Sequence, residues 1–219
     1  MDQERSKAEQ DLRVIRSLME RATVYRAISA PAALVAGFLS IFAAVAIYLN
    51  DETSINRPVQ CRAFAAIWLI VLILAVAANA FFIWREAKKD GRPFISSGMK
   101  LSLRAIAPNL LVPAAVTLWF LVSGYKGAAE QELVVVWIAF YGLALLSTAL
   151  FAPRSLVCLG WAFLLTALAF LALRNADGDL PVNLPNIAMG ITFGLYHLIY
   201  AVCAWPRKRA DEIEQFAVE

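Results

Sequence analysis

The sequence predicts an all-α integral membrane protein, a bundle of six transmembrane helices with a cytoplasmic amphipathic helix at its N-terminus. The chain of 219 residues is 61% hydrophobic, and its mean hydropathy of +0.65 exceeds that of ordinary soluble domains. Charged residues make up only 17% of the chain and cluster in blocks. The stretches between the blocks approach the ~20 residues that a helix needs to cross a bilayer. None of them alternates polar and apolar residues as the strands of a membrane β-barrel do.

The uncharged stretches define the predicted domain organisation. Residues 1–28 form the amphipathic segment, residues 29–205 the transmembrane domain, and residues 206–219 a cytoplasmic tail. The predicted spans are residues 29–49, 63–84, 105–122, 133–150, 156–173 and 185–205. Six crossings place both termini on the same side of the membrane.

Basic residues are distributed unequally between the two sides of this bundle. With a cytoplasmic N-terminus, sixteen of the 20 Lys and Arg residues fall on the cytoplasmic side. The other four are Arg57, Arg62, Lys126 and Arg174. This positive-inside bias predicts that both termini are cytoplasmic. A nucleic-acid-binding surface is not predicted, because each basic block adjoins a span and is interleaved with acidic residues.

The N-terminal segment carries an apolar stripe at helical spacing. Leu12, Ile15, Met19 and Ala22 lie on one face of a helix, and charged residues lie on the opposite face. This pattern predicts a helix that lies along the cytoplasmic membrane surface. The alternative interpretation is a docking helix that binds a protein partner or forms an oligomer.

The segment between the second and third spans is the main predicted cytoplasmic feature. Gly91 is expected to end the extended second helix. After it, Met99 and Leu103 share one helical face, and Lys100 and Arg104 share another. This arrangement predicts a short interfacial helix held to anionic lipid headgroups, with simple anchoring and a headgroup-binding role as the two interpretations.

The spans carry several positions expected to shape or join helices. Pro113 removes a backbone hydrogen bond and is expected to bend the third span. Gly190 and Gly194 form a GxxxG pair, which lets another helix approach closely, and Gly37 belongs to a small-residue stripe in the first span. His197 comes seven and three residues after these glycines, so an ideal α-helix places it on their face.

The candidate polar site within the membrane centres on His197, the chain's single histidine. Tyr196 and Tyr200 lie beside it in sequence, and Asn79 and Asn109 are polar groups on other spans. A buried titratable ring is expected to face protein rather than lipid. The two interpretations are a structural hydrogen bond and a role in binding a ligand or quinone or in sensing protons.

No catalytic, cofactor-binding or metal-binding residue is predicted. The cores of the spans contain no Asp, Glu, Lys or Arg, whereas proton-coupled carriers usually need such groups. The chain has no P-loop, no HExxH motif and no second histidine for a bis-histidine haem. Its three cysteines have no metal-ligand spacing.

Two stretches resemble an uncharacterised family of bacterial polytopic, six-span inner-membrane proteins. They are LRVIRSLMERATVY at residues 12–25 and TFGLYHLIY at residues 192–200. The resemblance implies location in a bacterial inner (cytoplasmic) membrane and carries over no catalytic residue.

These observations lead to two main hypotheses about function, with an intramembrane redox or lipid enzyme as a third. The first is a non-enzymatic sensor, accessory subunit or scaffold that meets a partner or anionic lipid through its cytoplasmic helix and basic loop. The alternative is a small-solute channel or permease that uses the bend in the third span and the face of His197. The pattern predicts no particular oligomeric state.

Overall fold

The fold is a bundle of membrane-length helices, seen in a computed structural model of the chain. The structure describes residues 30–51, 57–89, 91, 95, 97–123, 129–150, 152–177, 181 and 183–205. The first five described helices are α2 (Ala30–Asp51), α3 (Arg57–Lys89), α4 (Ser97–Ser123), α5 (Ala129–Leu146) and α6 (Arg154–Asp177). The last stretch, Leu184–Trp205, is called the C-terminal span: it begins as α7 (Leu184–Met189), continues as the π-helix η2 (Gly190–Leu195), and is α-helical again to Trp205.

Five of these helices are long and apolar enough to cross a membrane, so the predicted all-helical class is confirmed, with helices compatible with a membrane protein. They are Ala30–Leu49, Arg62–Lys89, Met99–Ser123, Arg154–Arg174 and Leu184–Trp205. The predicted fourth span corresponds to α5, which has 18 residues, carries Glu130 and Glu132 in its first turn, and is not one of the five. No strand occurs among the described residues. The predicted amphipathic helix (residues 1–28) and tail (residues 206–219) lie outside them.

The end of α5 differs from the sequence prediction. The helix ends at Leu146, and residues 147–150, predicted as part of the span, form a turn. In this turn the Thr148 hydroxyl donates to the Leu145 carbonyl at 2.6 Å, and the Ser147 hydroxyl donates to the Ala144 carbonyl at 2.8 Å. Both hydroxyls thereby satisfy carbonyls in the last turn of α5, where the helix ends.

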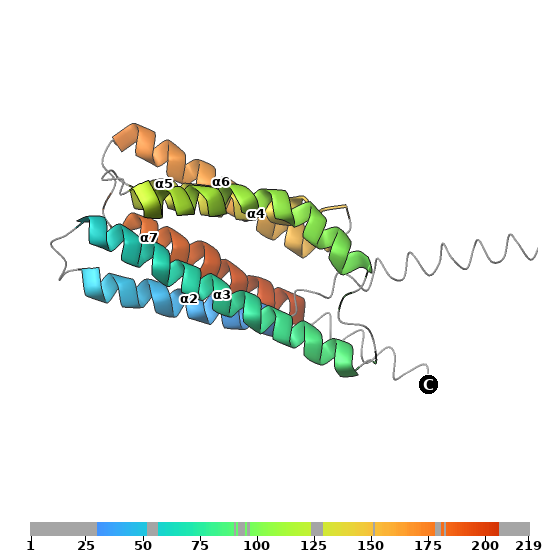
Figure 1. Cartoon of the computed structure of the whole chain (residues 1–219). Coiled ribbons are helices and arrows are strands. Elements are labelled where there is room, and N and C mark those ends of the chain that lie inside the picture. Colours follow the sequence, from blue (N-terminus) through green and yellow to red (C-terminus); the bar gives the residue numbers. More distant parts are fainter. Residues whose placement is uncertain are drawn as a thin grey trace, which may run out of the picture.

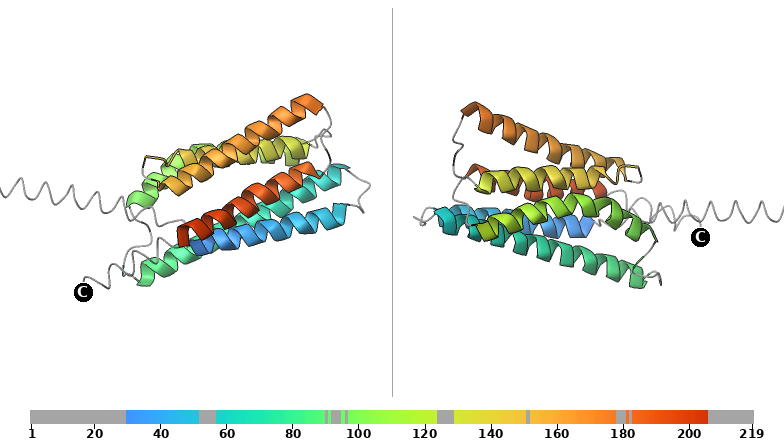
Figure 2. Two further views of the ribbon diagram at one scale, coloured as in Figure 1. Left: turned by 180° about the vertical axis from the view of Figure 1, so that it is seen from behind. Right: turned by 45° about the horizontal axis from the view of Figure 1, so that its top comes forward.

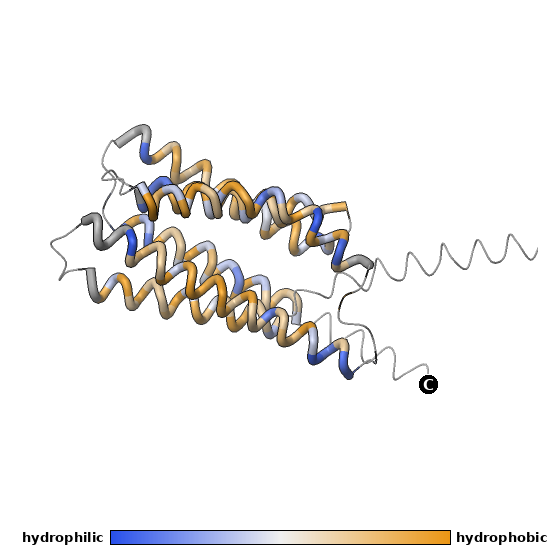
Figure 3. Tube along the Cα trace, viewed as in Figure 1, coloured by the Kyte–Doolittle hydropathy of each residue, from blue (hydrophilic) through white to orange (hydrophobic). Residues whose placement is uncertain are grey.

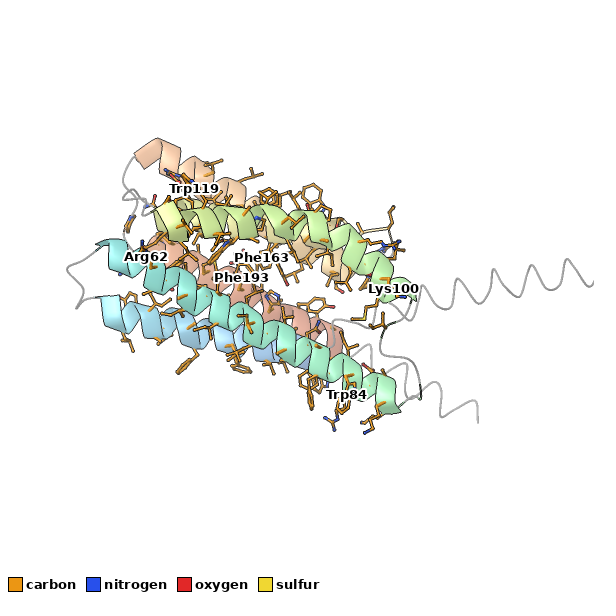
Figure 4. The ribbon with its side chains drawn as sticks, viewed as in Figure 1. Arg62, Trp84, Lys100, Trp119, Phe163 and Phe193 are labelled. Carbon is orange, nitrogen blue, oxygen red and sulfur yellow. The ribbon has the colours of Figure 1, made fainter. Side chains whose placement is uncertain are left out.

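The helices form two groups, as Figures 1 and 2 show. The first group consists of α2, α3 and the C-terminal span, and the second consists of α4, α5 and α6; α5 contacts both α3 and α7 across the boundary. Helix α2 begins and the C-terminal span ends at the same end of the bundle (Figure 1). Figure 4 labels Lys100 and Trp84 at this end and Arg62 and Trp119 at the other, so we call them the Lys100 end and the Arg62 end.

Helix α4 runs without interruption from Ser97 to Ser123. The interfacial helix predicted around Lys100 and Arg104 is therefore the first part of α4, not a separate element. Pro113 lies inside α4, and the part of this helix nearest the Lys100 end is bent relative to the rest (Figure 1). Gly91 comes after α3 with a φ of 62°, a left-handed conformation that glycine adopts readily and that ends the helix. Hydrophilic residues lie toward the helix ends, while the middle of the bundle is hydrophobic (Figure 3).

Candidate functional site

Inside each helix group, glycines bring two backbones into close approach. A Cβ on Gly194 would lie 2.7 Å from Ile41 Cγ1 and 3.6 Å from the Gly37 carbonyl oxygen, and a Cβ on Gly190 would lie 2.9 Å from the Ala44 Cβ. The predicted packing residues Gly37, Gly190 and Gly194 therefore all lie between α2 and the C-terminal span. We call this contact the α2 seam.

A second seam of the same kind joins α5 to α6. A Cβ on Gly142 would lie 2.9 Å from the Gly160 carbonyl oxygen and 3.0 Å from the Leu164 amide nitrogen. Both obstacles are backbone atoms, which cannot move aside as a side chain can. We call this contact the α5–α6 seam.

The π-helix η2 separates His197 from the glycine face on which an ideal α-helix would place it. Within η2 and its cap the hydrogen bonds span five residues, as from the Tyr196 amide to the Ile191 carbonyl. One extra residue in the turn rotates the rest of the helix by about 100° relative to an ideal α-helix. Gly190 and Gly194 consequently contact α2, whereas His197 is directed to α5 and α6.

Thr192 lies at the centre of η2 and has no exposed surface. Its hydroxyl donates to the Ala188 carbonyl at 2.8 Å and lies 3.4 Å from the Met189 carbonyl. These bonds satisfy carbonyls next to the π-turn, where the regular ladder is interrupted. The π-turn and this threonine thus set the direction of the His197 side chain.

His197 forms a hydrogen bond across the boundary between the two helix groups. Its Nε2 lies 2.8 Å from the Tyr141 hydroxyl of α5. Nδ1 is buried and makes no hydrogen bond with a described residue in standard geometry, although the backbone carbonyls of Thr192 and Phe193 lie close to the ring. Because those neighbours are acceptors, we assign the proton to Nδ1, so that the Tyr141 hydroxyl donates to Nε2.

A second hydrogen bond crosses the same boundary. The Thr166 hydroxyl of α6 donates to the Ala162 carbonyl at 2.8 Å and lies 2.9 Å from the Tyr196 hydroxyl. Since the threonine has one hydroxyl hydrogen, Tyr196 must be the donor in the second contact. Two neighbouring residues of the C-terminal span are thereby bonded to two helices of the other group.

Aromatic rings surround these two bonds. The Phe163 ring centroid lies 4.7 Å from that of Tyr141, 5.7 Å from that of His197 and 5.1 Å from that of Phe193. Figure 4 shows Phe163 and Phe193 in the middle of the bundle. Phe163 is completely buried and His197 is 6% exposed. We call the set Tyr141, Phe163, Thr166, Phe193, Tyr196 and His197 the polar–aromatic layer.

The structure brings together three of the five polar residues predicted for the site. His197 and Tyr196 belong to the layer, and Tyr200 is buried one turn further on. Asn109 instead has its amide 3.5 Å from the Ala105 carbonyl of its own helix. The Asn79 amide oxygen is buried and has no hydrogen-bond partner among the described residues.

Sequence reasoning missed the partners on the second helix group. Tyr141, Phe163 and Thr166 resemble many other residues in apolar spans, and nothing in the sequence pairs their helices with the C-terminal span. The only sequence signal for these partners was the presence of aromatic and hydroxyl residues in predicted spans four and five. At the Arg62 end, the bond from Trp137 Nε1 to the Thr117 hydroxyl at 2.8 Å was also missed.

The chemistry available to the layer is hydrogen bonding, because its polar groups are one imidazole and three hydroxyls. Among the described residues, no group of three or more His, Cys, Asp or Glu side chains could hold a metal ion. An ion pair between Arg174 and Glu132 at 3.2 Å lies outside the layer and joins α6 to α5 through side chains that are each 32% exposed. The layer itself therefore works through neutral hydrogen bonds.

Comparisons with protein-family models, curated proteins and solved structures find no match to this chain. The resemblance to a bacterial inner-membrane family stays a prediction, and function has to be inferred from the geometry of the layer and the distribution of charge.

Proposed function

We propose that this protein is a six-span protein of a bacterial cytoplasmic membrane that acts without catalysis, as a sensor, accessory subunit or scaffold. The proposal includes α5 as the sixth span and places both termini in the cytoplasm. Its support is the positive-inside distribution of basic residues, together with the position of both ends of the described bundle at the Lys100 end (Figure 1).

The observation that carries the non-enzymatic function is the packed state of the polar–aromatic layer. Its two inter-group hydrogen bonds join protein groups to one another, and Phe163, which touches four of the other five members, is completely buried. Such a layer connects the two helix groups through two hydrogen bonds and packed rings, beside the apolar core that the groups share. A sensor or accessory subunit needs this property, because the effect of a partner bound to one group can be transmitted to the other.

The test compares the full chain with a chain lacking residues 2–25, both purified from their native membranes. We expect one defined set of membrane proteins to co-purify with the full chain and to be lost with the deletion. A His197→Phe variant should retain the set, because the proposed contact lies on the cytoplasmic segment. Helix content by circular dichroism controls for membrane insertion. Identical sets for the full and shortened chains would contradict this function.

The alternative function, a small-solute channel or permease, is favoured by two features. His197 Nδ1 is buried without a partner in standard geometry, and α4 contains a proline bend at Pro113. Solute flux into proteoliposomes that contain the purified chain would support this alternative if His197→Phe abolished it. The scaffold proposal predicts no flux with either chain.

A further inference from the structure

The halves of α3 and α4 nearest the Lys100 end are the least covered parts of the bundle. No residue is buried in residues 72–89 of α3 or residues 99–116 of α4. By contrast, α2, α5, α6 and the C-terminal span each have buried residues in both halves. Helices α3 and α4 are consecutive in sequence but are not one of the substantially packed helix pairs.

The uncovered halves of α3 and α4 are mainly apolar and somewhat longer than one leaflet is deep. Their exposed side chains include Val76 and Phe81 on α3 and Leu103 and Leu110 on α4, each 47% exposed or more. Residues 72–84, which are apolar except for Asn79, extend about 20 Å along the helix. One leaflet contributes about 15 Å of the ~30 Å hydrocarbon thickness, so acyl chains of a single leaflet can cover most of this length.

The polar rim of this surface is strongly basic. Residues 85–104 contain six Lys and Arg and two acidic residues. Lys100 and Arg104 are exposed, and neither forms an ion pair with another described residue. Trp84 lies at the same level on α3, with Lys88 Nζ 5.3 Å from its ring centroid, and Figure 4 shows Trp84 and Lys100 at the same end of the bundle. Tryptophan beside basic residues is typical of the headgroup region.

We infer that the uncovered halves of α3 and α4 bind an anionic phospholipid of the leaflet at the Lys100 end. Its acyl chains lie along residues 72–84 and the apolar residues of α4, and its phosphate contacts Lys100 and Arg104. Basic sites beside membrane helices favour anionic headgroups. A second copy of the chain fits less well, because two copies meeting through this face would bring two sets of like charges together. The inference is independent of the proposed function, which concerns residues 2–25 and the polar–aromatic layer.

The experiment uses the full chain reconstituted in vesicles of equal phosphatidylglycerol and phosphatidylcholine, then extracted in mild detergent for native mass spectrometry. We expect the chain to retain phosphatidylglycerol in preference to phosphatidylcholine. The Lys100→Gln/Arg104→Gln double variant should lower the phosphatidylglycerol affinity about thirtyfold, since each basic residue near the surface contributes about fivefold. Lys100→Gln alone should lower it about fivefold, and the charge-preserving pair Lys100→Arg/Arg104→Lys should leave it unchanged.

Arg62→Gln is the matched control, because Arg62 is an exposed basic residue on α3 at the opposite end. It should leave lipid retention unchanged. Equal retention of the two lipids, or full retention by the double variant, would overturn the inference. So would a lipid-free dimer of the wild-type chain, which would assign the surface to a second copy. Displacement of the lipid by millimolar inorganic phosphate would overturn the part assigned to the acyl chains.

Discussion

The glycine seams and the polar–aromatic layer hold helices together in opposite ways. In the α2 and α5–α6 seams, glycines present no side chain, so the neighbouring helix lies directly against their backbone, as Gly160 does against Gly142. In the layer, the backbones are separated by rings, and the contact depends on bonds such as Tyr141 to His197. Each helix group therefore contains a close backbone contact, whereas the layer adds two hydrogen bonds to the apolar core that the two groups share.

The largest expected effect comes from filling the α5–α6 seam. Gly142→Val should lower the free energy of unfolding by about 1–3 kcal/mol, because the new side chain meets backbone atoms of α6 that cannot move aside alone. Unfolding of the purified protein in bicelles measures the change. Ala77→Val, at an exposed position of α3, is the control and should change little. Equal effects of the two substitutions would show that the seam is not close-packed.

The next effect comes from removing a hydroxyl of the layer. Tyr141→Phe should lower the free energy of unfolding by about 1 kcal/mol, because it leaves His197 Nε2 buried without a donor. Tyr48→Phe removes a hydroxyl from a side chain that is 51% exposed and should have no measurable effect. If both variants unfold like the wild type, the bond between Tyr141 and His197 contributes nothing to joining the groups.

A smaller effect is expected at the second bond of the same layer. Tyr196→Phe removes the donor to Thr166, but the Thr166 hydroxyl keeps its own bond to the Ala162 carbonyl. No buried donor is left unpaired, so the loss should be about 0.5 kcal/mol, near the average for membrane hydrogen bonds. The same measurement of unfolding in bicelles compares the loss in free energy of unfolding for Tyr196→Phe with that for Tyr141→Phe. A larger loss for Tyr196→Phe than for Tyr141→Phe would reverse the expected order.

The smallest effect is expected at the ion pair between Arg174 and Glu132. Both side chains are 32% exposed, so water and salt weaken their attraction. Arg174→Gln should lower the free energy of unfolding by about 0.2–0.5 kcal/mol at low ionic strength and by less in high salt. A loss that is independent of salt would contradict an electrostatic origin.

The membrane class and the approximate spans could be predicted because hydropathy is a property of each segment by itself. The predicted third span, residues 105–122, lies within α4 (Ser97–Ser123), and the predicted fifth span, residues 156–173, lies within α6 (Arg154–Asp177). The predicted end of α5 was wrong by four residues, since hydropathy does not distinguish a helix from the turn that residues 147–150 form.

The site could be predicted only on the C-terminal span. His197 is conspicuous in the sequence as the single histidine, but its partner Tyr141 lies 56 residues away on a helix with no sequence feature that pairs the two. The face of His197 was also mispredicted, because the spacing rule assumes 3.6 residues per turn and η2 departs from it. Contacts between distant helices depend on packing, which a single sequence does not display.

The most direct test of the layer uses the fact that the chain has one histidine. Labelling histidine with ¹⁵N gives solid-state NMR signals from the His197 ring alone in lipid bilayers. The structure predicts a neutral ring with the proton on Nδ1 and a hydrogen-bonded Nε2, and the Nε2 shift should change in Tyr141→Phe. A spectrum unaffected by Tyr141→Phe would contradict the hydrogen bond between the two helix groups, whereas a proton on Nε2 would contradict the assigned tautomer and make His197 the donor in that bond.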